Sequence, residues 1–302
     1  MISPRTPGRP HTPYDRSRSF TLVPDREALF RMSTHLPLAF YDTDPHGAHA
    51  ATPVVLGHGF ALDHTLWTPQ TRALRTERRV MRWDMPGHGS SSARERFTFW
   101  EVARSVLAHL DAHRLQRFVI GGLSQGGFVA LRVALLAPER IAGLILADTE
   151  AHRCSDLEAQ AYRELFGHLA AVGTSPAHTG QLAAQILGHG PAAEPVVAQW
   201  QQVWADRLPS AFGHPVDALI ERDDLTDRLS EITAPTLLLR GSEDSAIPPE
   251  RMQFLQQHLP GAGPVHTIHG AAHAPPLTHP EEVTALVRSF LAEIDDQPIG
   301  TP

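Results

Sequence analysis

The sequence predicts an α/β fold, with a mostly parallel eight-stranded sheet that carries helices on both faces. Two observations predict this class. Short apolar or β-branched runs alternate with longer segments in which apolar residues recur at helical spacing, as in consecutive strand–helix units. The runs 54–56 and 141–147 are apolar throughout, which is typical of strands buried on both faces of a parallel sheet. The expected strands span 29–34, 37–42, 54–56, 79–84, 118–121, 141–147, 235–241 and 264–268.

Length and composition limit the kind of protein. The chain has 302 residues, of which 42% are hydrophobic, enough for one large domain or for a core with an inserted lobe. The formal net charge is −7 and no basic stripe is present, so no nucleic-acid partner is expected. There is no lysine, which excludes Schiff-base and P-loop lysine chemistry. Cys154 is the only cysteine, which excludes an intramolecular disulfide and a cysteine-rich metal site.

Three regions differ in character. Residues 1–25 are rich in Pro, Arg, Thr and Ser without an apolar period, which predicts a flexible N-terminal tail. Residues 26–150 and 231–295 carry the strand and helix patterns of the core. Residues 151–230 lack strand-like runs, which predicts a helical cap, or lid, inserted after the sixth strand. Its helices are expected at 155–172, 178–188, 195–208 and 216–229.

No apolar segment of the sequence is long enough to span a membrane, and none resembles a signal peptide. We therefore expect a soluble, cytoplasmic protein without a membrane partner. The oligomeric state stays open, with a homodimer as one option.

The strongest catalytic signal lies in residues 118–128. An apolar, β-branched run ends in glycines, Ser124 follows, and an apolar helical pattern begins after two more glycines. Gly122-x-Ser124-x-Gly126 between a strand and a helix is typical of a nucleophile elbow, which lifts a serine hydroxyl above the edge of a sheet. Side chains at the two glycines would clash in so tight a turn. The helix would direct its positive N-terminus at the serine, where an oxyanion forms.

The third expected strand leads into the sequence Gly-His-Gly-Phe. This sequence is either a simple glycine turn or an oxyanion loop, in which a backbone N–H points toward the nucleophile. We favour the oxyanion loop, with the N–H of Phe60 as the first donor and the N–H of Gln125 as the second. His58 and Gly59 are then expected to border the substrate pocket.

A serine nucleophile needs a base that takes its proton and an acid that orients the base. His273 is the candidate base, because it closely follows the last strand and imidazole titrates near neutrality. Asp244, in the loop after the preceding strand, is the candidate acid. Loops that follow parallel strands meet at one edge of the sheet, so these residues are expected to converge. Asp148 and Glu150, after the sixth strand, and the neighbouring Glu243 remain alternative acids.

Two patterns that would indicate a cofactor are incomplete. A Gly-x-Gly pair follows the fourth strand, but the third glycine of a dinucleotide site is missing and a proline lies in the turn. A structural turn is favoured there, with His88 solvated or hydrogen-bonded. His109 and His113 have helical i, i+4 spacing but lack the glutamate and third ligand of a zinc site. We expect no cofactor and no metal.

Trp200 and Trp204 share one face of the third helix expected in the cap. This face either packs the cap on the core or forms an aromatic wall of the substrate pocket, and the sequence leaves both open.

Seven stretches together carry a family likeness, namely His58–Asp63 with Trp67, Trp83–Ser90, Gly122–Gly127, Ala137–Ile141, Leu146–Thr149, Gly241–Asp244 and Gly270–His273. They resemble the α/β-hydrolase superfamily, most closely its branch of enol-lactonases, esterases and cofactor-free haloperoxidases. The resemblance covers roughly residues 37–292 without most of the cap. Epoxide hydrolases and haloalkane dehalogenases of this fold carry aspartate as nucleophile, so Ser124 disfavours both. Many relatives carry Met where this chain has Gln125, so the resemblance implies no particular substrate.

The motifs and the resemblance together imply a serine hydrolase. It would cleave a carboxylic ester or lactone of a small or medium apolar molecule through an acyl-enzyme on Ser124, without a cofactor. His273 would act as base and Asp244 as orienting acid. The alternatives are a carbon–carbon bond hydrolase or a perhydrolase with the same triad, and a non-catalytic ligand receptor on this fold. The substrate stays open because the cap shapes the pocket.

Overall fold

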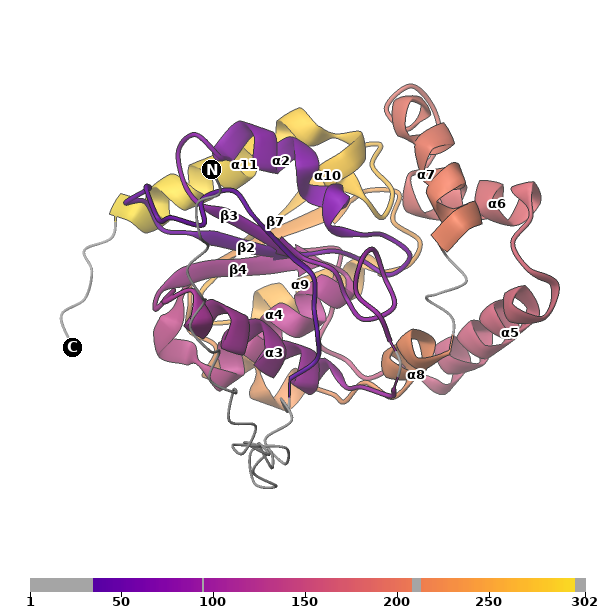
Figure 1. Ribbon diagram of the computed structural model, residues 1–302, viewed down its shortest axis with the longest axis horizontal. Coiled ribbons are helices and arrows are strands. Elements are labelled where there is room, and N and C mark those ends of the chain that lie inside the picture. The colour runs from indigo at the N-terminus through magenta and orange to yellow at the C-terminus, as the bar shows by residue number, and fades with distance from the viewer. Residues whose placement is uncertain (1–34, 94, 208–212, 297–302) are drawn as a thin grey trace, which may run out of the picture. The chain divides into compact units, whose positions relative to one another are not determined.

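The computed structural model describes residues 35–93, 95–207 and 213–296, called the described residues below. They form one sheet with the strand order β1-β3-β2-β4-β5-β6-β7 (Figure 1). β1 is antiparallel to β3, and all other neighbouring strands are parallel. The strands are Phe40–Asp42 (β1), Val54–Gly57 (β2), Val80–Trp83 (β3), Phe118–Leu123 (β4), Ile141–Ala147 (β5), Thr236–Gly241 (β6) and Ala262–Ile268 (β7).

The described part of the sheet has seven strands where the sequence predicted eight. The predicted α/β class and the mostly parallel arrangement are confirmed, and each of the seven strands matches a predicted run. The remaining strand, expected at 29–34, and the tail expected at 1–25 lie outside the described residues.

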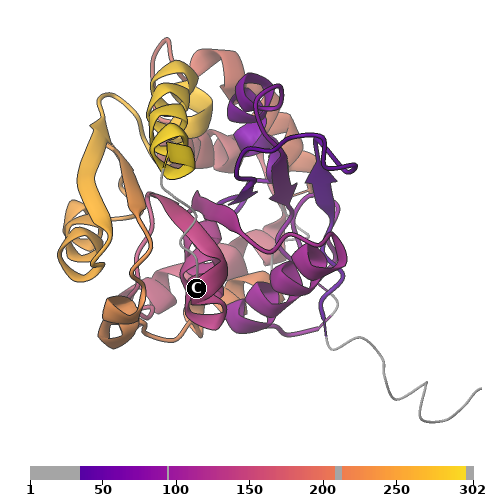
Figure 2. The same cartoon turned by 90° about the vertical axis from the view of Figure 1, so that its left-hand side faces the viewer.

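Helices cover both faces of the sheet because successive strand side chains point to opposite sides. Ile120 of β4 packs in one core with α3, α4 and α9, whereas its neighbour Val119 packs in a second core with α2 and α11. Figures 1 and 2 show these two helical layers on either side of the strands. The helices are Thr68–Leu74 (α2), Phe99–Ala112 (α3), Gln125–Leu136 (α4), Pro249–His258 (α9), Pro275–Thr278 (α10) and Pro280–Asp296 (α11), with short 3₁₀ turns at His64–Trp67 (η1) and Pro138–Arg140 (η2).

Between β5 and β6 the described chain is helical. Figure 1 shows these helices together beside one end of the sheet. The helix expected at 216–229 is interrupted, because the Asp224 carboxylate accepts hydrogen bonds from the N–H groups of Thr226 and Arg153 at 2.9 and 3.0 Å and holds a loop there. None of the described helices combines the length and apolar character of a membrane span. The elements are Asp156–Val172 (α5), Pro176–Ile186 (α6), Glu194–Arg207 (α7), His214–Ile220 (α8) and Thr226–Glu231 (η4).

Gly126→Ala is expected to destabilise the fold. A Cβ at this first turn of α4 would lie 2.6 Å from the carbonyl carbon of Gly57, in the backbone of β2. Because that backbone is held in the sheet, we expect a loss of about 1–3 kcal/mol in the free energy of unfolding, measured by chemical denaturation.

Gly167→Ala is the matched control. Gly167 is exposed inside α5, and a Cβ there meets no atom within 4 Å. Alanine has the higher helix propensity, so this substitution should be neutral or stabilise by up to about 1 kcal/mol. Equal losses in both variants would contradict the steric explanation.

Candidate active site

Ser124 lies in a sharp turn between β4 and α4, with φ 52° and ψ −115°. Positive φ is strained for a residue with a side chain and persists only where the surroundings enforce it. Three contacts enforce it here. The Ser124 N–H donates to the Ala147 carbonyl at 3.0 Å, and its own carbonyl accepts from the Thr149 hydroxyl at 2.8 Å and from the Gly127 N–H at 2.8 Å. The elbow is therefore fixed by β5 as well as by its own helix.

His273 and Asp244 are joined across the loops that follow β7 and β6. His273 Nδ1 lies 2.9 Å from Asp244 Oδ2, and both side chains are buried. Asp244 Oδ1 accepts from the N–H groups of Ala246 at 2.7 Å and Ile247 at 3.3 Å. Burial acts to raise the pKa of Asp244, but the charge and hydrogen bond of His273 outweigh it and lower that pKa. A carboxylate that accepts from Nδ1–H leaves Nε2 free to take a proton.

The hydrogen bonds of the described residues include none between the Ser124 hydroxyl and His273. The two residues follow β4 and β7, which are separated in the sheet by β5 and β6. Catalytic hydrogen bonds are often long without substrate and tighten when it binds. The structure thus joins the candidate acid and base and holds the candidate nucleophile at the same edge of the sheet.

The alternative acids have other partners. Glu150 is buried in an ion pair with the equally buried Arg222, at 2.7 Å, and its second oxygen lies 3.2 Å from Arg251. Glu243 is exposed to solvent. Asp148 accepts the Gly241 N–H with both carboxyl oxygens, at 3.0 and 3.2 Å. Asp244 is the carboxylate that reaches the imidazole.

His58 stabilises the loop after β2, and its place at the border of the substrate pocket stays a prediction. It is fully buried, and its Nδ1–H donates to the Gly59 carbonyl at 2.7 Å while Nε2 accepts the Met85 N–H at 2.9 Å. Burial lowers the pKa of His58, which keeps the ring neutral and able to play both roles. Gly59 is also buried, and a Cβ there would lie 3.0 Å from Leu123.

His88 supports the same loop from the turn after β3. It is buried rather than solvated, and its Nε2 accepts the Ala61 N–H at 3.2 Å. Burial, aided by His58, lowers the pKa of His88 to about 3, so the ring stays neutral. The Phe60 ring packs edge-on against His88, with centroids 5.1 Å apart, and also against Phe166 of α5, at 5.0 Å. The loop that carries Phe60 thus contacts both the turn after β3, through His88, and α5, through Phe166.

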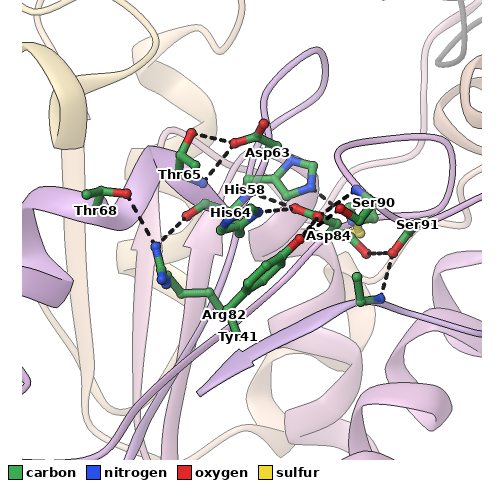
Figure 3. Close-up of polar contacts among 12 residues, drawn as sticks. Tyr41, His58, Asp63, His64, Thr65, Thr68, Arg82, Asp84, Ser90 and Ser91 are labelled. Atoms are coloured by element: carbon green, nitrogen blue, oxygen red, sulfur yellow. Dashed lines mark hydrogen bonds and ion pairs between the residues drawn. The ribbon is translucent and has the colours of Figure 1, made fainter. Parts of the chain in front are cut away.

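Asp84, at the end of β3, organises a network that the sequence analysis missed. Figure 3 shows Tyr41, His64 and Ser90 converging on its carboxylate. Oδ1 accepts from the N–H and Nδ1–H of His64 at 2.8 and 2.9 Å, and Oδ2 accepts from the Tyr41 hydroxyl at 3.0 Å and the Ser90 N–H at 2.8 Å. Burial alone would raise the pKa of Asp84, but these donors and the nearby His58 lower it.

The Asp84 network ties the loop after β2 to the loop after β3. A sequence signal for it exists in Gly89, which has φ 53° and where a Cβ would overlap the Asp84 carboxylate. The Gly-x-Gly pair is therefore a structural turn, as predicted, but its second glycine makes room for a buried anion.

Trp204 connects α7 to the loop after β2. Its Nε1–H donates to the Ala61 carbonyl at 2.6 Å, and the side chain is 1% exposed. Trp200, one turn earlier and 2% exposed, packs in the same core, with the two rings 5.9 Å apart. Arg207 adds an ion pair with Asp63 at 3.4 Å. Of the two functions left open for this helical face, packing of the helices on the core is the one these contacts support.

Comparison with known proteins gives a family. A family model described as the alpha/beta hydrolase fold matches residues 52–280. The chain is 31% identical over 259 residues to a pimeloyl-[acyl-carrier protein] methyl ester esterase of Neisseria meningitidis, covering 83% of this chain and 80% of that protein. It is 25% identical over 258 residues to 3-oxoadipate enol-lactonase 1 of Acinetobacter baylyi, covering 82% and 92%. Among solved structures, a thermophilic esterase from Thermogutta terrifontis with malate bound superposes with a TM-score of 0.76 at 30% identity, covering 85% and 94%.

Trp204→Phe is expected to loosen the contact between α7 and the loop after β2. The substitution keeps an aromatic ring but removes the donor from the Ala61 carbonyl. We expect the free energy of unfolding to fall by about 1–3 kcal/mol. Trp200→Phe is the matched control, because Trp200 is equally buried in the same helix and its Nε1–H makes no hydrogen bond among the described residues. If denaturation gives the same loss for both variants, the hydrogen bond is not what holds the two segments.

Proposed function

The chain belongs to the α/β-hydrolase fold family, and from this premise we propose that it is a serine hydrolase acting on a carboxylic ester or lactone. One observation carries the proposal. His273 Nδ1 lies 2.9 Å from Asp244 Oδ2 at the edge of the sheet where Ser124 occupies a strained turn. A nucleophile, a base and an orienting acid are the groups that acyl transfer requires.

In the first half of the reaction, Ser124 Oγ attacks the carbonyl carbon of the substrate and His273 Nε2 takes the hydroxyl proton. Asp244 stabilises the imidazolium that forms and keeps Nδ1 protonated. The tetrahedral intermediate then expels the alcohol, which receives the proton from His273, and an acyl group remains on Ser124. In a lactone the expelled alcohol stays attached to the acyl chain. Water, deprotonated by His273, attacks the acyl carbonyl and releases the acid and the free serine.

The oxyanion of each tetrahedral intermediate would be bound by the N–H groups of Phe60 and Gln125. Two observations support these donors. Gln125 is the first residue of α4, so its N–H has no acceptor within the helix. The Phe60 N–H has no hydrogen-bond acceptor among the described residues, although the N–H groups of Ala61 and Leu62 both have one. A donor of this kind contributes about 3 kcal/mol to stabilising the transition state.

Esters and lactones are the substrates we favour because the relatives named above are two esterases and an enol-lactonase. Under the same proposal, helices α5–α8 act as a lid that bounds the site. Phe166 of α5 packs on Phe60 and Trp204 of α7 binds Ala61, so the lid contacts the loop that would hold the oxyanion. The apolar side chains at this contact fit a small apolar acyl or alcohol group.

A fluorophosphonate probe tests the proposal, since it phosphonylates a serine only when that serine is activated as a nucleophile. We expect the full-length protein to be labelled and Ser124→Ala to remain unlabelled. Ser289→Ala, at an exposed serine of α11, is the matched control and should label like the wild type. Failure of the wild type to react would falsify the proposed mechanism.

His273→Ala is expected to lower kcat by about 10⁴–10⁶-fold, because it removes the base. Hydrolysis of p-nitrophenyl esters of increasing acyl length and of lactones of increasing ring size measures the loss, with Ser124→Ala as the blank. Turnover of carbon–carbon ring-cleavage products or of peroxide in preference to these substrates would instead identify one of the alternative reactions. Tight ligand retention with a single slow turnover would identify a receptor.

A further inference from the structure

A second buried carboxyl group lies beside Asp244. Asp148 directly follows β5, is fully buried, and has φ 39°. Its N–H donates to the Leu239 carbonyl of β6 at 2.9 Å, which extends the pairing of the two strands by one residue. The strained backbone directs the residue toward the end of β6, where the loop with Asp244 begins. Asp148 is thus fixed by main-chain contacts and not by its side chain alone.

The Asp148 carboxyl has two neighbours. Both of its oxygens accept the Gly241 N–H, at 3.0 and 3.2 Å, and the Gly241 carbonyl in turn accepts the Asp244 N–H at 3.3 Å, so Gly241 links the two acidic residues. The Asp148 and Asp244 carboxyls are close enough to shift each other's pKa. Two buried carboxyl groups that interact in this way cannot both be ionised without a large cost, because like charges repel strongly in a buried site. One of them must therefore carry a proton and donate it to the other.

The surroundings assign the proton to Asp148. Asp244 already accepts from His273 and from two backbone N–H groups, all of which favour its ionised form. Among the described residues, the Asp148 carboxyl accepts from one N–H group, that of Gly241. Burial, reinforced by the charge of Asp244, raises the pKa of Asp148 well above its usual range, and Arg240 of β6 opposes this only in part. Asp244, Arg240 and, through Asp244, His273 are the charged or titratable groups that act on it.

We propose that Asp148 is a positioning residue, a neutral carboxyl that donates a hydrogen bond to the Asp244 carboxylate and holds it against His273. The proposal rests on the proposed function, in which Asp244 orients the base. Asp148 touches neither substrate nor reacting atoms in this scheme. It fixes the rotation of the Asp244 carboxylate, and its hydrogen bond weakens the effect of the Asp244 negative charge on the His273 imidazole.

Asp148→Asn and Asp148→Gly separate this role from simple packing. The asparagine amide can donate to Asp244 while its oxygen accepts the Gly241 N–H, and both asparagine and glycine tolerate positive φ. On the best p-nitrophenyl ester we expect Asp148→Asn to keep kcat/KM within about threefold of the wild type. Asp148→Gly should lower kcat by about 10- to 100-fold through misplacement of the base.

The pH dependence of kcat/KM gives a readout that loss of packing would not move. Without its donor, the Asp244 carboxylate stabilises the imidazolium more strongly, so in Asp148→Gly the acid limb should move to higher pH by about half a unit or more. In Asp148→Asn a neutral group replaces a neutral group, and the limb should stay in place. If Asp148 were ionised, Asp148→Asn would remove a negative charge and the limb would move to lower pH.

Two results would overturn the proposal. One is an acid limb at lower pH in Asp148→Asn, and the other is an Asp148→Gly variant with unchanged turnover and pH profile. Should the glycine variant not fold, as judged by its thermal unfolding, the asparagine variant alone decides: an acid limb that stays in place supports a neutral Asp148, and a limb at lower pH overturns the proposal.

An NMR titration of the His273 ring protons distinguishes failure of this proposal from failure of the proposed function. The titration midpoint should be the same in wild type and Asp148→Asn and higher in Asp148→Gly, whether or not the protein hydrolyses esters. Unmoved midpoints in all three, in a protein that the fluorophosphonate labels, would reject Asp148 as a positioning residue and leave the hydrolase intact.

Discussion

A contact between backbones at three glycines constrains the rest of the structure. Gly57 ends β2, Gly122 lies near the end of β4 and Gly126 lies in the first turn of α4. A Cβ at any of the three would come within about 3 Å of a neighbouring segment. The helix can therefore approach both strands more closely than side chains would permit. Because β2 continues into the loop with Phe60 and β4 into Ser124, this contact sets the spacing between the candidate nucleophile and the proposed first oxyanion donor.

Backbone strain gathers at the same edge of the sheet. Four non-glycine residues of the described chain have positive φ, and three of them, Ala61, Ser124 and Asp148, follow the adjacent strands β2, β4 and β5. Each such residue costs about 1–3 kcal/mol and persists only where its surroundings enforce it. Here the enforcing bonds come from His88 and Trp204, from Thr149, and from Leu239 respectively. The rigid parallel sheet thus supports the strained turns that present the candidate site.

The sequence predicted those features that depend on neighbours along the chain. The strands, the turn at Ser124 and the loops with Asp244 and His273 follow from local patterns and from the rule that parallel strands end at one edge. The features that it missed depend on tertiary contacts. The part of His58 in holding the loop could not be read from the sequence, because nothing local indicates that the Met85 N–H binds its second nitrogen. Asp84 was missed because its partners come from three separate segments. The substrate could not be predicted for the same reason, since Phe166 and Trp204 contact Phe60 and Ala61 from more than 100 positions away.

The bond between Trp204 and Ala61 joins residues 143 positions apart. It has a consequence for chimeras built between this chain and its relatives. A graft that replaces α5–α8 would leave the Ala61 carbonyl facing a foreign helix. The chimera would gain the substrate selectivity of the new helices, but the loop with Phe60 and Ala61 would be held less firmly. Recombination schemes should accordingly choose crossover points so that positions 61 and 204 are inherited from one parent.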